Sequence, residues 1–334
     1  MNGTDKTVSL AEAQPLVIAK DVMKDFGIGG GFLRGQGQPV RAINNVSLEI
    51  RQGEVLGVVG ESGSGKSTLG RLLLRLLEPT AGEIRFDGRD LSSIPPRELR
   101  KFRRHMQMIF QDPYASLNPR MMIGDALMEA IRLHQGLSKA DAKEAAAALL
   151  GQVGLTREHL RRYPRAFSGG QRQRVAIARA LASQPRFIVA DEPVSSLDVS
   201  IQAEVINLLQ DLQRELHLSL LFISHDLSVV EILADRVMVL YLGRVMEIAP
   251  TEVLYARPAH PYTVALMQAA PGARRGGNRL ILSGEIPSAR NPPSGCVFRT
   301  RCPFAVNDCA VGRPPLREVK DGHFKACIRD DLAL

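Results

Sequence analysis

The sequence of 334 residues contains no tryptophan, and aromatic residues make up only 5% of it. Proteins that bind single-stranded nucleic acids stack the bases on aromatic side chains, so this shortage argues against such a role despite a formal net charge of +8. Two basic clusters, within residues 97–104 and 157–165, contribute to that charge. We interpret them as solvated faces, which could lie near anionic lipid headgroups, rather than as a nucleic-acid footprint.

Long apolar runs are also missing. None approaches the roughly 18 residues that a membrane-spanning helix needs, and Met1 to Pro15 lacks the charged-then-apolar order of a signal peptide. We therefore expect a cytoplasmic protein. The apolar fraction of 45% suits a globular chain with one large core and an appendage, or with two modest domains.

Cysteine is absent until the C-terminal region, where all four lie at Cys296, Cys302, Cys309 and Cys327. Disulfides are disfavoured in a reducing cytoplasm, and four cysteines match the ligand count of either a [4Fe–4S] cluster or structural Zn²⁺. The intervening gaps of five, six and seventeen residues differ from the closely paired spacing of zinc sites. The pattern thus favours a [4Fe–4S] cluster, with Zn²⁺ or four free thiols in a small core as alternatives.

The strongest motif present is Gly-Glu-Ser-Gly-Ser-Gly-Lys-Ser-Thr at residues 60–68. It fits the phosphate-binding loop, because a predicted buried strand at 55–59 precedes it and a predicted helix at 69–77 follows. Glycines let backbone N–H groups surround an anion at the positive end of the helix. Lys66 should reach the β- and γ-phosphates, and the Ser67 hydroxyl should bind Mg²⁺. The predicted nucleotide contacts are Gly60, Glu61, Ser62, Gly63, Ser64, Gly65, Lys66, Ser67 and Thr68.

Strands and helices alternate along the centre of the chain, which predicts an α/β sheet. A glycine-rich stretch at 27–37 and a proline-rich C-terminal part after residue 250 interrupt this order. The predicted strands are 17–19, 42–50, 83–86, 106–110, 187–190 and 220–223, with a hairpin at 237–248; helices are predicted at 171–182 and 201–216 and through most of 121–160, and a linker at 272–278.

A second acidic motif completes the chemistry of hydrolysis. Asp191 and Glu192 follow a buried strand, where Asp191 can hold Mg²⁺ through its hydration shell and Glu192 can polarise a water for attack on the γ-phosphate. His225 follows another core strand, which suggests contact with the γ-phosphate. Ser168, Gly169 and Gly170 form a further anion cradle before a helix. This cradle makes most sense if it caps the nucleotide of another subunit.

These motifs together resemble the ATP-binding subunit of an ABC transporter. The resemblance implies a P-loop ATPase domain with a RecA-like core, an antiparallel β subdomain and a helical subdomain, and it implies catalytic roles for Gln111, Glu192 and His225. It also implies that five residues contact the ATP bound by a partner subunit. These are Ser168, Gly169, Gly170, Gln171 and Asp198. The motif assignments are Walker A at Gly60–Thr68, Walker B at Ile188–Glu192, the Q-loop at Gln111, the signature at Phe167–Gln171, the D-loop at Ser195–Asp198, the switch at His225, adenine contacts at Phe26 and Val40, and Mg²⁺ contacts at Ser67, Gln111 and Asp191.

Three further segments narrow the resemblance to dipeptide and oligopeptide importers of the DppF/OppF type. They are residues 107–120, His260–Thr263 and Asn291–Cys296. This subfamily implies an ATP hydrolase that pairs with a second, different D-type ATPase chain at the cytoplasmic face of the membrane. Two membrane-spanning permease subunits and, indirectly, a peptide-binding protein complete the system. Members are reported to hold a [4Fe–4S] cluster in this tail.

The resemblance also predicts the domain organisation. It divides the chain into an N-terminal arm (1–16), an ATPase domain (17–250) with a helical subdomain (about 112–182), and a C-terminal region (251–334) with a four-cysteine module (291–330). Three residues depart from the usual pattern: Phe26 replaces Tyr, Phe167 replaces Leu, and Ser196 replaces Ala.

Two other functions compete with import. Soluble ABC ATPases that act on DNA separate the Walker motifs by a long coiled coil, whereas here they lie within about 130 residues without sustained heptads. Ribosome-binding types carry two ATPase units, and this chain has one. An exporter subunit is the other alternative, and the Pro- and Cys-rich tail argues against it.

Overall fold

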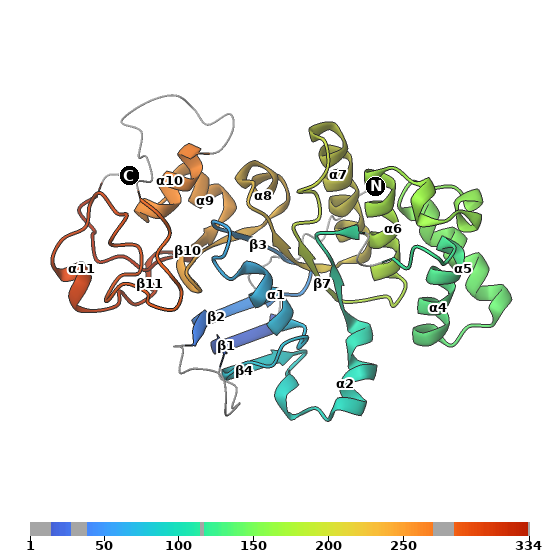
Figure 1. The fold of residues 1–334 in the computed structure, drawn as a ribbon, viewed down its shortest axis with the longest axis horizontal. Helices are drawn as coiled ribbons and strands as arrows, with labels where there is room; N and C mark the ends of the chain where they lie inside the picture. Colours follow the sequence, from blue (N-terminus) through green and yellow to red (C-terminus); the bar gives the residue numbers. More distant parts are fainter. Residues whose placement is uncertain (1–14, 28–38, 114–116, 270–283, 333–334) are drawn as a thin grey trace, which may run out of the picture.

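The computed structural model describes residues 15–27, 39–113, 117–269 and 284–332 (Figure 1). Three predicted features lie wholly or mostly outside these ranges: the N-terminal arm, the glycine-rich stretch and the linker at 272–278. Two residues of the predicted arm are described, and they begin the first strand rather than a loose segment, since β1 starts at Pro15.

Two β-sheets form the framework of the molecule. The smaller one is antiparallel with the order β2-β1-β4-β5, and the larger one has the order β11-β12-β10-β9-β3-β8-β7-β6. The five strands from β9 to β6 in this order are parallel to one another, and the strands beyond β9 pair antiparallel. The bounds are β1 Pro15–Phe26, β2 Val40–Arg51, β3 Val55–Val59, β4 Ala81–Phe86, β5 Arg89–Asp90, β6 Met106–Ile109, β7 Phe187–Asp191, β8 Ser219–Ile223, β9 Arg236–Tyr241, β10 Arg244–Pro250, β11 Arg317–Lys320 and β12 His323–Lys325.

Helices cover the large sheet and extend beyond it. The α-helices are α1 Lys66–Leu73, α2 Pro96–Phe102, α4 Ile123–Gln135, α5 Lys139–Gln152, α6 Gly169–Leu181, α7 Val199–Leu216, α8 Leu227–Leu233, α9 Thr251–Ala256, α10 Pro261–Ala269 and α11 Asp308–Val311. Short 3₁₀ turns occur at η1 Leu91–Ser93, η2 Arg103–His105, η3 Arg157–Arg161 and η4 Pro164–Ala166. The predicted α/β fold class is confirmed.

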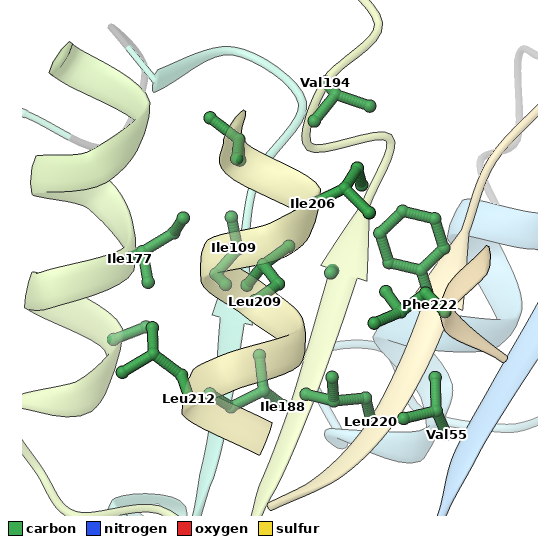
Figure 2. Packing of buried hydrophobic residues seen from close by; sticks show 14 of the residues in the cluster. Val55, Ile109, Ile177, Ile188, Val194, Ile206, Leu209, Leu212, Leu220 and Phe222 are labelled. Atoms are coloured by element: carbon green, nitrogen blue, oxygen red, sulfur yellow. The ribbon is translucent and has the colours of Figure 1, made fainter. Parts of the chain in front are cut away.

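The two faces of the large sheet bury different cores, because alternate side chains of a strand point to opposite faces. Val55 and Leu220 point to the face covered by α6 and α7, whereas Leu56 and Leu221 point to the face covered by α1 and the small sheet. Figure 2 shows the first face, where Ile206, Leu209 and Leu212 of α7 pack over Ile109, Ile188 and Leu220 of three neighbouring strands.

Helices α4 and α5 lie at one end of the molecule and α11 at the other, with the sheets between them (Figure 1). The predicted helical stretch at 121–160 is divided because Gly136 ends α4 in a left-handed conformation with φ 70°. The predicted helix at 69–77 begins earlier, at Lys66, and its regular turns stop at Leu73. The sequence predicts that Phe110 continues the core strand. This is wrong, because β6 ends one residue earlier, at Ile109, and Phe110 is 38% exposed.

The cysteine-rich tail is joined to the large sheet. Strand β12 pairs with β10, and the join is reinforced by Glu247, whose carboxylate is fully buried. It accepts hydrogen bonds from the backbone N–H groups of Ala259 at 2.6 Å and His260 at 3.0 Å, and it lies 2.7 Å from Nε2 of His323. Because an unpaired buried carboxylate is costly, this arrangement fixes how residues 259–260 and β12 meet the sheet. None of the described helices is both long enough and apolar enough to cross a membrane.

Candidate active site

The phosphate loop connects β3 to α1 and needs glycine at two of its positions. At Gly60 (φ +151°) a Cβ would lie 2.1 Å from the carbonyl oxygen of Leu240, and at Gly65 (φ +105°) it would lie 2.5 Å from that of Ala42. Neither distance is possible for a real side chain. The loop therefore packs its backbone directly against β2 and β9, and this packing constrains its shape.

Lys66, the first residue of α1, lies inside this loop and is 5% exposed. Its ammonium donates to the carbonyl oxygens of Gly60 at 2.7 Å and Glu61 at 3.1 Å. Burial lowers the pKa of Lys66, while the negative charges of Glu192, Asp191 and Glu61 act in the opposite direction. The ammonium is thus a buried cation that donates to two carbonyl oxygens, with carboxylates nearby, and such a cation is suited to bind an anion of high charge.

The fold brings together two of the predicted Mg²⁺ contacts. Ser67 lies at the start of α1, and Asp191 is the last residue of β7. The hydroxyl of Ser67 donates to Oδ1 of Asp191 at 2.7 Å. Asp191 is only 3% exposed at the end of β7, and this burial raises its pKa although the hydrogen bond from Ser67 opposes the change. A hydroxyl beside a carboxylate is an oxygen donor set that Mg²⁺ accepts, so these residues fit the ion.

The three predicted catalytic residues meet at the same edge of the large sheet. Oε2 of Glu192 lies 3.1 Å from Nε2 of Gln111, which donates to it, and 3.2 Å from Nδ1 of His225. The three residues follow β6, β7 and β8, which are adjacent parallel strands. Their carboxyl ends must reach one edge of the sheet, which is where ligands bind in α/β folds.

The backbone of Glu192 has φ 47°, a left-handed conformation that residues other than glycine rarely adopt. Its N–H donates to the carbonyl oxygen of Ile223 at 3.0 Å, which holds the turn against β8. Such strain typically accompanies a functional position. Here it directs the carboxylate towards Gln111 and His225 instead of along the strand.

The predicted adenine contacts are neighbours across the small sheet. Phe26 at the end of β1 pairs with Val40 at the start of β2. The ring of Phe26 is 39% exposed, and the ammonium of Lys24 lies 5.2 Å from its centroid. A partly exposed aromatic ring can stack on a base.

The second predicted anion cradle lies elsewhere in the molecule. Ser168 caps α6: the N–H of Gln171 donates to its hydroxyl at 3.3 Å, and its own N–H donates to Oε1 of Gln171 at 3.1 Å. Helix α6 covers the sheet face opposite to the one that α1 covers. Asp198 is at the N-terminus of α7, and both Gly169 and Gly170 approach that neighbourhood, next to Leu197 and Ile201. The structure thus groups the predicted signature with the predicted D-loop rather than with the phosphate loop of its own chain.

Two residues that the motifs did not identify reach the phosphate loop from the C-terminal region. The hydroxyl of Tyr262 accepts a hydrogen bond from the N–H of Glu61, and the guanidinium of Arg301 pairs with the Glu61 carboxylate. In the sequence, the segment His260–Thr263 indicates only a family resemblance. Arg301 has no sequence signal, since nothing in a linear pattern links positions 240 residues apart.

The four cysteines converge on one small cavity, which they line together with Phe298 and Phe304. Burial raises the pKa of the Cys302 thiol to about 11, so without a metal this thiol stays protonated at neutral pH. Among the residues that the structure describes, no three or more His, Cys, Asp or Glu side chains are arranged to hold a metal ion. The cysteines therefore fit a metal centre in number and convergence, but not in the arrangement that the structure gives their sulfurs.

Comparisons with known proteins identify the family to which the chain is similar. The sequence profile of the family described as "ABC transporter" matches residues 43–195, which include the phosphate loop and both acidic residues. A second profile, "Oligopeptide/dipeptide transporter, C-terminal region", matches residues 246–309.

Curated relatives cover nearly the whole chain. A Brucella ovis protein named as a peptide import ATP-binding protein is 61% identical over 88% of this chain and 93% of its own length. The oligopeptide transport ATP-binding protein AppF of Bacillus subtilis is 48% identical over 96% of this chain and 99% of its own.

Solved structures match the ATPase part. The ATP-binding cassette MJ0796, solved as a dimer with ADP and Pi, covers 70% of this chain and 98% of its own with 31% identity and a TM-score of 0.62. The cbiO1 protein of Clostridium perfringens, part of an ABC transporter complex, covers 72% and 91% with 27% identity and a TM-score of 0.63. The chain has the phosphate loop and the acidic strand end, and its relatives match it over nearly its whole length. It therefore belongs to the ATP-binding proteins of the ABC transporter family.

Proposed function

We propose that this chain is the ATP-binding subunit of an importer for dipeptides or oligopeptides, and that it binds and hydrolyses MgATP to drive uptake. The observation that carries the proposal is the convergence of Gln111 and His225 on Glu192, beside the Ser67–Asp191 pair. The peptide part of the proposal draws on the names of the curated relatives and on the profile that matches residues 246–309.

In this proposal each residue of the site has a separate task. The loop N–H groups and Lys66 hold the β- and γ-phosphates, and Ser67 and Asp191 hold Mg²⁺, which when bound neutralises charge on the phosphates. Glu192 accepts a proton from the attacking water. His225 and Gln111 orient the Glu192 carboxylate and the γ-phosphate, and Phe26 with Val40 holds the adenine.

The active form should be a head-to-tail pair of ATPase subunits. The segment Ser168–Gln171 with Asp198 lies on a different sheet face from α1, so one chain cannot apply both elements to one nucleotide without a large rearrangement. A partner's copy of this segment would instead close over the ATP bound here. The dimeric form of the MJ0796 cassette supports this arrangement, and we propose a different, D-type chain as the partner.

The isolated chain is therefore expected to hydrolyse ATP slowly. Its ATPase activity should rise at least about tenfold when the second ATPase chain is added, because each site then gains a signature segment that stabilises the transition state. The measurement is phosphate release at equal total protein, with the oligomeric state followed by light scattering. High activity in strictly monomeric protein would refute the composite site.

We further propose that two membrane-spanning permease subunits hold the ATPase pair at the cytoplasmic face of the membrane, and that a peptide-binding protein delivers the solute. The test of this part is purification of the chain together with its permease subunits. Retention of peptides by the binding protein of the same system would then identify the solute class.

The four cysteines are proposed to bind one metal centre, more specifically a [4Fe–4S] cluster than Zn²⁺. Their side chains line a common cavity, and the sulfurs would have to rearrange to ligate a metal, because no group of three or more ligands is arranged for one among the described residues. A short module with little apolar core gains stability from such a centre. No step of ATP hydrolysis depends on it.

Anaerobic purification is expected to yield a coloured protein with iron and acid-labile sulfide in equal amounts. Binding should weaken at low pH, because metal ligation requires the thiols to lose their protons. The measurement is iron, sulfide and zinc analysis with a visible spectrum, and Cys302→Ser serves as the variant that removes one ligand. A colourless protein with stoichiometric zinc would refute the cluster, and a protein with no metal would refute the site.

A further inference from the structure

The phosphate loop is tied to the cysteine-rich tail by an ion pair that phosphate binding by itself does not require. The guanidinium of Arg301 donates to both carboxylate oxygens of Glu61, from Nη1 to Oε2 at 2.6 Å and from Nη2 to Oε1 at 3.0 Å. The Arg301 side chain is 5% exposed and that of Glu61 is 22% exposed. A bidentate pair of this kind fixes the orientation of both groups as well as their distance.

Arg301 is itself held firmly by its surroundings. Its guanidinium lies 5.9 Å from the ring centroid of Tyr241 and 3.4 Å from the Tyr241 hydroxyl. The rings of Tyr241, Tyr262 and Phe298 form a mutual cluster with centroid separations of 4.7, 5.2 and 5.5 Å. The ion pair is thus anchored on β9, on α10 and on the tail at once, which makes it a rigid support.

The backbone of the same loop residue is held as well. The N–H of Glu61 donates to the hydroxyl of Tyr262, which is fully buried, at 2.9 Å. The carbonyl oxygens of Gly60 and Glu61, which flank this N–H along the backbone, accept hydrogen bonds from the ammonium of Lys66. The contacts from the tail therefore act on the segment that positions the phosphate-binding lysine.

We propose that Arg301 is a positioning residue for ATP binding, which holds Glu61 in place and neutralises a carboxylate that lies close to the phosphate site. The proposal rests on the proposed function only in taking ATP as the ligand. Without Arg301, the partly buried Glu61 carboxylate has lost its cation, so it competes with the phosphates for Lys66 and repels the nucleotide. The loop also loses the contact that fixes its first turn.

The test is ATP affinity, measured on the full-length chain with a fluorescent ATP analogue so that hydrolysis and a partner are not needed. Arg301→Ala is expected to raise the dissociation constant about tenfold. The control is Arg299→Ala, which removes the same charge from the same module; Arg299 donates to Ser294, not to the loop. Arg299→Ala should bind the analogue as the wild type does.

A second variant isolates the contribution of the unpaired Glu61 charge. In Glu61→Gln/Arg301→Ala the repelling charge is removed along with the arginine, so most of the lost affinity should return. Because an unfolded tail would also leave Glu61 unpaired, the intact fold of the tail is checked separately, by hydrogen exchange of the peptide that contains β12, which should match the wild type in both variants. The proposal is overturned if Arg301→Ala binds within twofold of the wild type, or if the double variant binds no better than Arg301→Ala.

Arg301→Lys keeps the charge and the fold but not the two-pronged geometry, which covers the case in which Arg301→Ala does not fold. Hydrogen exchange of the phosphate-loop peptide should be several-fold faster in nucleotide-free Arg301→Lys than in the wild type and in Arg299→Lys. Unchanged exchange and unchanged affinity would overturn the positioning role. A wild-type chain that bound no ATP at all would instead overturn the proposed function.

Discussion

Replacing Lys66 with alanine should lower the affinity of the chain for ATP by at least about a hundredfold and abolish transport. The ammonium is the cation that the loop encloses, with its pKa lowered by burial and its charge supported by Glu192, Asp191 and Glu61. Hydrogen bonds to charged groups contribute about 1.5–3 kcal/mol each, and Lys66 should make them to two phosphates. The measurement is binding of a fluorescent ATP analogue together with ATPase activity of the assembled complex.

The loop should survive this substitution, because its shape depends on Gly60 and Gly65 rather than on the lysine. We therefore expect little change in the melting temperature. Lys143→Ala is the matched control, since Lys143 is exposed on α5 far from the sheet edge. Wild-type ATPase activity in the Lys66→Ala complex would contradict the assignment of the loop.

Glu192→Gln is expected to retain ATP binding but to reduce hydrolysis by about 10²–10⁴-fold, the usual contribution of a general base. The amide has nearly the same shape as the carboxylate and can still contact Gln111 and His225. It cannot accept the proton of the attacking water. The ATPase pair should then remain closed around unhydrolysed ATP, which single-turnover kinetics and size-exclusion chromatography would detect.

The control for this variant is Glu215→Gln, at an exposed position near the end of α7. It makes the same chemical change away from the site and should leave both binding and turnover unchanged. Normal turnover in Glu192→Gln would assign the proton acceptor to another group.

Much of this site could be predicted from the sequence because its parts are local. A glycine-rich loop between a strand and a helix fixes Lys66 and Ser67 within a few residues of each other. Acidic or polar residues directly after buried strands are carried to one edge by a parallel sheet. The convergence of Gln111 and His225 on Glu192 follows from the strand order, although the conformation of Glu192 with positive φ does not.

The contacts of the C-terminal region could not be predicted in this way. Arg301 and Glu61 meet through the packing of the tail, in which β12 pairs with β10 and Arg301 contacts Tyr241 of β9. Glu247 in the same region has no motif around it, yet it lies fully buried between two backbone N–H groups and His323. Contacts of this kind depend on tertiary packing, which no periodicity in the sequence encodes.

The exposure of Phe110 is another feature that the sequence pattern does not predict. Four apolar or neutral residues precede it and extend the strand pattern, so the sequence predicts that it continues the core. The strand instead stops at Ile109, two residues before Gln111. Hydrophobic periodicity therefore does not by itself predict where this strand ends.

The role of this chain in import is tested most directly by peptide uptake into vesicles that contain the complete complex, with ATP on the side of this chain and the peptide-binding protein on the other. We predict that peptide accumulates only with ATP, and that accumulation and hydrolysis fall together when Glu192→Gln replaces the wild-type chain. Uptake that continued at the wild-type rate with Glu192→Gln, or rapid ATP hydrolysis without accumulation of any peptide that the binding protein retains, would contradict the claim that this chain powers peptide import.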